Sequence, residues 1–235
     1  MSETSSTPLT TAINFNTPSN SDGRLSTSHT NARLETRKLR FSINPNLVDK
    51  SSDMRLSTSG WVEIEDTVDK LIEAVQGEGW AFSYVFLDGV RTVANFRYTD
   101  ILAVDIDGGW NIEEFSTREF VRQNCAFIYT TPSHSPDEHR FRAVFVSPVG
   151  ITKTSDLKAV TTSLSRRLVG DPSTTDAARV WFGSQGCTVN WIGATLQFDV
   201  FNELLLDGQT VIPHVARSGQ SIPGSRSQLR FSPDN

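Results

Sequence analysis

Two aspartates at the end of an apolar run are the residues of this chain best suited to chemistry. The segment ILAVDIDGG carries four apolar residues, then Asp105 and Asp107 around one isoleucine, then a pair of glycines. A short apolar run that ends at glycines predicts a buried strand, and residues two apart on a strand share a face. Two carboxylates on one face repel unless a cation lies between them, and oxygen ligands of this kind suit Mg²⁺ or Mn²⁺. The alternative is a strand end at which both acids are simply solvated.

A second group of polar residues lies in a hairpin-like unit further along the chain. Residues 126–130 (AFIYT) and 140–146 (RFRAVFV) each predict a strand, and the turn-rich segment between them contains His134. Arg140 and Arg142 fall on one face of the returning strand. A histidine and two arginines so placed can bind phosphate through charge-assisted hydrogen bonds. A polar loop and an exposed strand face are the alternatives.

A third group lies in residues 170–184, GDPSTTDAARVWFGS, and supplies Asp171, Asp176 and Arg179 ahead of a short aromatic strand. Carboxylates of the first and third groups would bind metal ions, and the histidine and arginines would bind phosphates. Together the three groups form the inventory of a site that transfers nucleotidyl groups.

The order of these three segments resembles that of the catalytic motifs of the archaeo-eukaryotic primase (AEP) superfamily. The resemblance is closest to the primase-polymerases of plasmids, phages and mobile elements. Residues 129–145 are similar to the second motif of that group, and residues 171–184 to its third. The resemblance covers about residues 80–184. It implies an α+β fold in which an RRM-like sheet, mixed or antiparallel, packs against an N-terminal α/β module, with the active site between them.

The resemblance also implies which acids bind metal. Asp105 and Asp107 match the first motif and would be ligands of one or two Mg²⁺ or Mn²⁺ ions. Asp171 is our choice for the third ligand. It departs from the family pattern because Gly170 separates it from the preceding apolar residue, so Asp176 is kept as the alternative catalytic acid.

The second motif implies the contacts to the nucleotide. The residues expected to bind it are Ser133, His134, Arg140, Arg142 and Arg179. His139, five residues after His134, is the alternative for the histidine.

The activity that the resemblance implies is template-directed, metal-dependent nucleotidyl transfer from dNTPs or NTPs during DNA replication. The expected partners are a single-stranded DNA template, a primer, a nucleotide and a replicative helicase, and not a membrane. Two other classes are compatible with the residues alone. One is a non-catalytic replication-initiator module that binds DNA, and the other is a nuclease or nucleotide-sugar transferase that also uses an Asp-x-Asp pair.

Composition restricts the class of protein further. The chain has 235 residues, 37% of them hydrophobic, and a formal net charge of −5. That charge argues against a simple nucleic-acid coat protein, which is normally basic, although a local basic groove can still hold a template. Cys125 and Cys187 are too few to form a zinc site. No membrane span or signal peptide is evident, and we expect a cytoplasmic protein.

The chain is expected to contain one folded domain with two flexible ends. Residues 1–35 are rich in Ser and Thr and poor in apolar residues, which is typical of a disordered segment. Residues 36–208 would form the catalytic domain, and residues 209–235 a flexible tail or linker. Trp181 and Phe182 are expected in the core rather than as surfaces on which bases stack.

The remaining elements are predicted from periodicity and from helix-capping patterns. Residues 80–86 and 92–96 are expected to form a hairpin, and residues 196–200 a last strand followed by a short helix near 202–206. The expected helices are one from Thr67 to Gly77 or Gly79, one that starts at Thr117 after a Ser116–Glu119 capping box, and one over residues 155–168.

Overall fold

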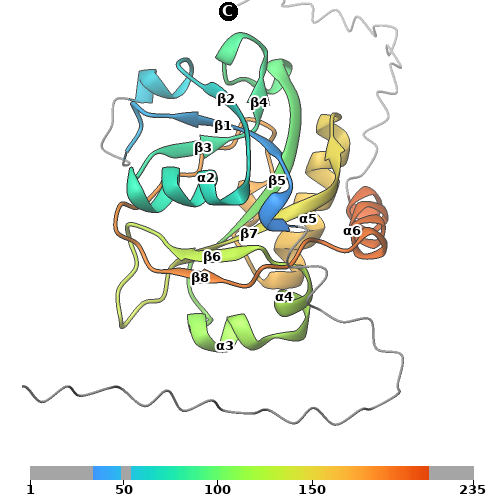
Figure 1. The fold of residues 1–235 in the computed structure, drawn as a ribbon. Helices are drawn as coiled ribbons and strands as arrows, with labels where there is room; N and C mark the ends of the chain where they lie inside the picture. Colours follow the sequence, from blue (N-terminus) through green and yellow to red (C-terminus); the bar gives the residue numbers. More distant parts are fainter. Residues whose placement is uncertain (1–33, 49–53, 212–235) are drawn as a thin grey trace, which may run out of the picture.

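The computed structural model describes residues 34–48 and 54–211 (Figure 1). The flexible ends expected at residues 1–35 and 209–235 lie, apart from their innermost residues, outside this part of the chain and stay predictions. None of the described helices is long and apolar enough to cross a membrane.

The described strands form two antiparallel sheets. The first has the order β2-β1-β3 and the second β4-β5-β7-β6-β8. Every strand pair is antiparallel, so the fold is the expected α+β type with antiparallel rather than mixed sheets. The strands are β1 (Leu39–Asn44), β2 (Val62–Asp66), β3 (Ala81–Ser83), β4 (Val85–Phe86), β5 (Phe96–Ile106), β6 (Phe127–Thr130), β7 (Phe141–Ile151) and β8 (Val189–Trp191).

Helices pack around both sheets. In Figure 1, α2 lies beside the three-stranded sheet, while α5 packs on β5 and carries α6 on its outer side. The helices are α2 (Val68–Ile72) with its π-helical continuation η2 (Glu73–Gly77), α3 (Ile112–Thr117), α4 (Glu119–Asn124), α5 (Thr154–Leu168) and α6 (Phe198–Val211). Short 3₁₀ turns are η1 (Met54–Ser57), η3 (Leu87–Gly89), η4 (Val93–Asn95) and η5 (Pro172–Thr174).

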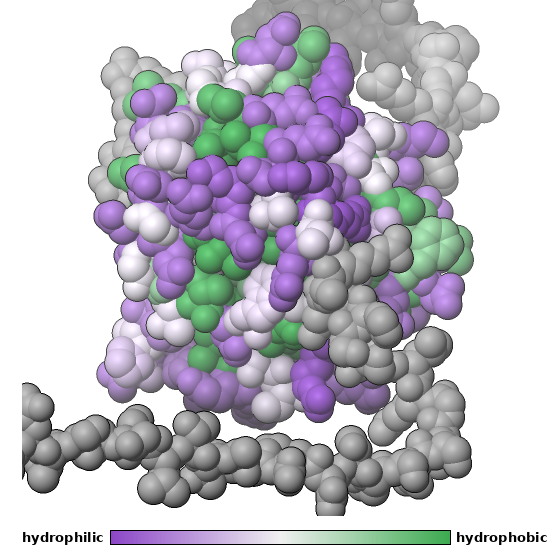
Figure 2. Space-filling model, viewed as in Figure 1, coloured by the Kyte–Doolittle hydropathy of each residue, from purple (hydrophilic) through white to green (hydrophobic). Residues whose placement is uncertain are grey.

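Strand β5 is the centre of the core and carries the Asp-x-Asp pair. Its residues from Thr99 to Ile106 are all buried, because α5 packs on the strand and β1 lies against it. A strand covered in this way needs a continuous apolar run rather than an alternating one, which is the pattern seen in the sequence. The face shown in Figure 2 is mostly hydrophilic, with apolar residues in separate patches between the polar ones.

The predictions for β5, β6, β7, α5 and the α2–η2 helix are confirmed, but others need correction. Residues 92–96 do not form a strand, because η4 covers Val93–Asn95 and β5 begins only at Phe96. The expected strand over residues 80–86 is split, since β3 joins the first sheet and β4 pairs with β5 in the second. Residues 196–200 do not form a strand, because α6 begins at Phe198 and buries Phe201 and Leu204 at helical spacing. The last strand is instead β8, which the sequence did not reveal.

The capping box predicted at Ser116 is also wrong. Asn111 caps α3 instead, with its side-chain oxygen accepting a hydrogen bond from Glu113 N at 2.8 Å. Ser116 lies inside α3 and donates to Glu113 O, and extended backbone at Arg118 then separates α3 from α4.

Candidate active site

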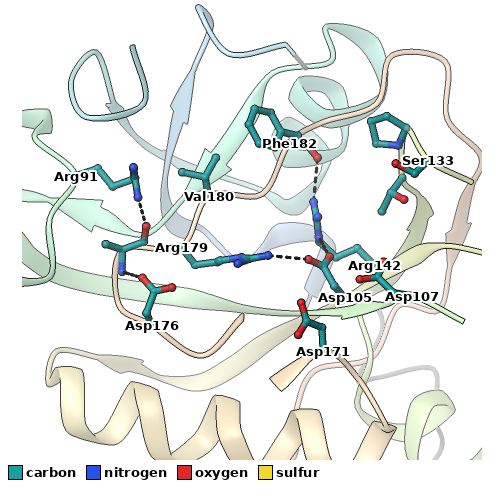
Figure 3. A pocket seen from close by; sticks show the side chains of 13 residues that line it. Arg91, Asp105, Asp107, Ser133, Arg142, Asp171, Asp176, Arg179, Val180 and Phe182 are labelled. Atoms are coloured by element: carbon teal, nitrogen blue, oxygen red, sulfur yellow. Dashed lines mark hydrogen bonds and ion pairs between the residues drawn. The ribbon is translucent and has the colours of Figure 1, made fainter. Parts of the chain in front are cut away.

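One pocket gathers residues from all three of the segments singled out in the sequence (Figure 3). Its volume is about 410 Å³. The loop after η3, the end of β5, the β6–β7 loop, β7 and the segments on both sides of η5 all contribute to its lining. The lining residues are Arg91, Asp105, Asp107, Thr131, Pro132, Ser133, Arg142, Asp171, Asp176, Ala178, Arg179, Val180 and Phe182. All four candidate acids are therefore in one cavity.

Strand register places a charged pair in the wall of this pocket. Asp105 of β5 lies directly opposite Arg142 of β7, and Arg142 lies opposite Tyr129 of β6. Directly opposed residues in antiparallel strands project to the same face, so these three side chains form one row across the sheet.

Arg142 is the most enclosed of the candidate arginines. Its side chain is only 7% exposed. Its Nε donates to Asp105 Oδ1, and its Nη1 donates to Tyr129 Oη and, at 2.9 Å, to Phe182 O. Tyr129 Oη donates in turn to Phe182 O at 3.1 Å. The guanidinium thus donates hydrogen bonds to three protein acceptors.

Arg179 occupies the other oxygen of Asp105. Its Nη2 lies 3.3 Å from Asp105 Oδ2, and its side chain is 28% exposed. Burial alone would raise the pKa of the Asp105 carboxyl, but the charges of Arg142 and Arg179 and their hydrogen bonds outweigh it and hold the pKa below its usual value. Asp105 is therefore an ionised, buried carboxylate with both oxygens engaged.

Asp107 lies in different surroundings although it is only two residues further on. It follows the last paired residue of β5 and is exposed. Among the described residues, no hydrogen bond or ion pair to its carboxylate is formed. Its carboxylate is free to bind a ligand in the pocket.

Asp171 is fixed close to the end of β5 by its backbone. Its N–H donates to Asp105 O at 2.9 Å. This approach requires the preceding glycine, since a Cβ on Gly170 would lie 2.2 Å from a methyl carbon of Val104. The absence of a side chain at Gly170 thus allows Asp171 to approach the end of β5.

The carboxylates of the two candidate third acids both cap local backbone. Asp171 accepts hydrogen bonds from Ser173 N at 2.8 Å and Ser173 Oγ at 2.6 Å. Asp176 accepts one from Ala178 N at 2.8 Å. Both remain in the pocket lining, but Asp171 is the one joined directly to the strand of the Asp-x-Asp pair.

The second motif contributes unequally to the pocket. Ser133 lines it, whereas His134 and Arg140 are not among its lining residues. His134 Nδ1 accepts a hydrogen bond from Arg140 N at 3.2 Å, and His139 Nδ1 accepts one from Ile112 N at 3.2 Å. The two rings contact each other with centroids 5.2 Å apart, and each keeps Nε2 as the nitrogen able to donate to a ligand. The choice between the histidines stays a prediction.

Six lining residues were not predicted as site residues from the sequence, among them Arg91 and Phe182. Arg91 lies in the loop after η3. Its guanidinium donates to Ala178 O and to Ser57 O, and so connects the loop that carries Asp176 to η1. No motif surrounds Arg91, so no sequence signal marked it. Phe182 lines the pocket and is half-buried, although it was expected in the core; its neighbour Trp181 is fully buried as predicted.

The donor set fits a hard divalent ion only in combination with a substrate. Among the described residues, no three His, Cys, Asp or Glu side chains stand close enough to hold a metal ion by themselves. Mg²⁺ commonly binds through one or two carboxylates, several waters and the phosphates of a substrate. Asp107 and Asp171 meet this requirement, with Asp105 beside them.

Comparison with known proteins gave matches only among solved structures. No protein-family model and no curated protein matches the sequence. The AEP domain of the cyanophage S-2L primase-polymerase matches with 13% identity and a TM-score of 0.42, covering 73% of this chain and 90% of that one.

Two structures of the primase RepB′ also match. One has 10% identity and a TM-score of 0.40 over 78% of this chain and 60% of that one. The other, a catalytic domain in complex with initiator DNA, has 11% identity and a TM-score of 0.41 over 82% and 96% of the two chains.

Proposed function

We propose that this chain is a primase-polymerase catalytic domain that performs template-directed, metal-dependent nucleotidyl transfer from dNTPs or NTPs. One observation carries the proposal: four aspartates and the arginine Arg179, from segments far apart in the sequence, line a single pocket. Acids that can bind a cation next to cations that can bind phosphate are what such a transfer requires.

The carboxylates at the pocket would hold Mg²⁺ or Mn²⁺. Asp107 and Asp171 present oxygens to the cavity, and Asp105 lies between them and the arginines (Figure 3). A bound divalent ion would lower the pKa of the attacking hydroxyl and neutralise charge on the triphosphate and pyrophosphate. Asp176 shapes the loop that carries Arg179 through its hydrogen bond to Ala178 N.

The remaining lining would bind and orient the nucleotide. Arg179 and the Ser133 hydroxyl can donate to phosphate oxygens, and an arginine can do so with two hydrogen bonds at once. Val180 and Phe182 give the cavity an apolar side, which suits the sugar or base. A single-stranded DNA template and a primer are the proposed partners, together with a replicative helicase.

A second candidate function is a non-catalytic replication module that binds DNA. One observation favours it: both oxygens of Asp105 are engaged by arginines, and the described residues contain no cluster of three metal-binding side chains. A fold kept only for DNA recognition would not need a free metal site.

A primer-extension assay separates the two functions. The full chain is incubated with a primed single-stranded template, Mg²⁺ or Mn²⁺, and labelled dNTPs or NTPs. We expect metal-dependent extension by the wild type, loss of extension in Asp107→Asn, and full extension in Asp199→Asn, which alters an exposed aspartate of α6. Absence of incorporation with every nucleotide set, together with a DNA gel shift that EDTA does not change, would support the non-catalytic module instead.

A further inference from the structure

The two arginines that neutralise Asp105 are held in very different ways. Arg142 is buried and donates to three acceptors, Asp105, Tyr129 Oη and the backbone oxygen of Phe182. If its guanidinium left, the buried Asp105 carboxylate, Tyr129 Oη and Phe182 O would each lose a hydrogen bond, which is costly. Arg142 is therefore a fixed counter-ion that positions Asp105.

Arg179 is held by its backbone but hardly by its side chain. Its carbonyl oxygen accepts a hydrogen bond from Ser83 Oγ at 2.5 Å, which fixes the residue beside β3. Its guanidinium, in contrast, makes a single long contact to Asp105 Oδ2 and is more than a quarter exposed. Its Nε is buried and has no hydrogen-bond partner among the described residues. The side chain can therefore leave Asp105 at little cost.

We propose that Arg179 is the exchangeable counter-ion of Asp105. In the free protein Arg179 covers Oδ2; when a nucleoside triphosphate enters the pocket, Arg179 moves to its phosphates and Oδ2 becomes available to a divalent cation. This rests on the proposed function, since the triphosphate is the group that attracts Arg179. A triphosphate offers more negative charge and a better geometry for a guanidinium than one carboxylate oxygen does.

Exchange of this kind makes metal and nucleotide bind cooperatively. Without nucleotide, a cation and Arg179 compete for the same oxygen of Asp105. With nucleotide, the competitor has moved and the phosphates add ligands for the cation. Each ligand must then raise the affinity of the other by the same factor. The pocket would hold a cation tightly only when a substrate is present.

Removal of the Arg179 side chain should therefore have opposite effects on the two affinities. Free Mn²⁺ is measured by electron paramagnetic resonance, with and without a non-hydrolysable dNTP analogue, and binding of the analogue is measured by calorimetry. In Arg179→Ala we expect Mn²⁺ affinity without nucleotide to rise by at least about fivefold, and affinity for the analogue to fall by at least about fivefold, in the usual range of coupling between sites. Arg166→Ala is the control, because Arg166 pairs with Asp207 and is not part of the pocket lining.

Arg179→Gln provides a second variant that keeps much of the side-chain stem, in case the alanine variant does not fold. Unchanged or weaker Mn²⁺ binding in both variants, while the wild type binds the analogue, would overturn the exchange and leave the proposed function intact. Failure of the wild type to bind the analogue at any Mn²⁺ concentration would overturn both.

Discussion

Asp105 and Asp107 are two residues apart at the end of one strand, yet their burial and their charged neighbours differ. Asp105 is 7% exposed and lies between two guanidinium groups. Asp107 is exposed, and among the described residues its carboxylate forms no hydrogen bond or ion pair, although the charge of Arg140 acts on it. The difference follows from the sheet: Ile106 is the last residue of β5 that pairs with β7, so Asp105 faces Arg142 and Asp107 lies beyond the ladder. A shared motif thus supplies one carboxylate that arginines hold in the pocket wall and one that is already free to bind a ligand.

The same contrast separates the inner wall of the pocket from its rim. Asp105, Arg142 and Tyr129 form a buried row across three strands, held by register. The rim consists of residues in loops, among them Asp107, Ser133 and Asp171. Changes to the inner row should therefore act mainly on stability, and changes to the rim mainly on ligand binding.

Arg142→Ala should give the largest change in stability. It leaves Asp105 buried without its main partner, and breaking a buried ion pair in this way costs about 3–5 kcal/mol. Urea denaturation followed by circular dichroism measures the free energy of unfolding. Arg140→Ala is the matched control, because its pair with Glu138 is partly exposed and should contribute little to stability. Equal losses in the free energy of unfolding would show that the buried Arg142 matters no more for stability than the partly exposed Arg140.

The two histidines of the second motif, which lie outside the pocket lining, should have a smaller effect. If His134 donates to a phosphate, His134→Ala should weaken binding of a nucleotide analogue by roughly 1.5–3 kcal/mol, the cost of one hydrogen bond to a charged group. His139→Ala should weaken it much less, and calorimetry on both variants gives the comparison. The reverse order would move the role of the second motif to His139.

The contribution of the Asp105 charge to the free energy of unfolding should depend on pH. Because the pKa of Asp105 is held below its unfolded value of about 3.9, its ionised form stabilises the folded state above that pH. This stabilisation is lost as the pH falls through the lowered folded-state pKa. The difference in unfolding free energy between the wild type and Asp105→Asn should therefore shrink from pH 7 towards pH 3. A difference that is constant over this range would mean that the Asp105 charge contributes nothing.

Asp199→Asn serves as the control for that titration. Its side chain is exposed on α6, and its difference from the wild type should stay small at every pH. A pH dependence in this variant similar to that of Asp105→Asn would point to a general effect of acid on the fold.

Much of the fold could be predicted because buried elements leave a strong pattern. Strands β5, β6 and β7 read as apolar runs, and α5 repeats its apolar residues at helical spacing. Strand β8 could not be predicted, since it has three residues at a sheet edge and is only partly buried. The start of α6 was misread because a short apolar stretch fits a strand as well as a helix turn.

The residues that line the pocket could be predicted from the sequence more readily than the contacts between them. The acids, Ser133 and two of the arginines could be singled out by type and spacing, and they do line one pocket. The pairing of Asp105 with Arg142 depends on the register of β5 against β7, which a single sequence does not specify. Arg91 reaches the pocket from a loop without any motif, so only the three-dimensional arrangement reveals it.

A crystal structure of the protein with Mn²⁺ and a non-hydrolysable dNTP analogue tests the central claim most directly. We predict an anomalous manganese peak bound by Asp105 Oδ2, Asp107 and Asp171, with the triphosphate in the same pocket and in contact with Arg179. Nucleotide bound elsewhere, or a pocket that contains neither manganese nor phosphate at saturating concentrations, would contradict a metal-dependent nucleotidyl-transfer site.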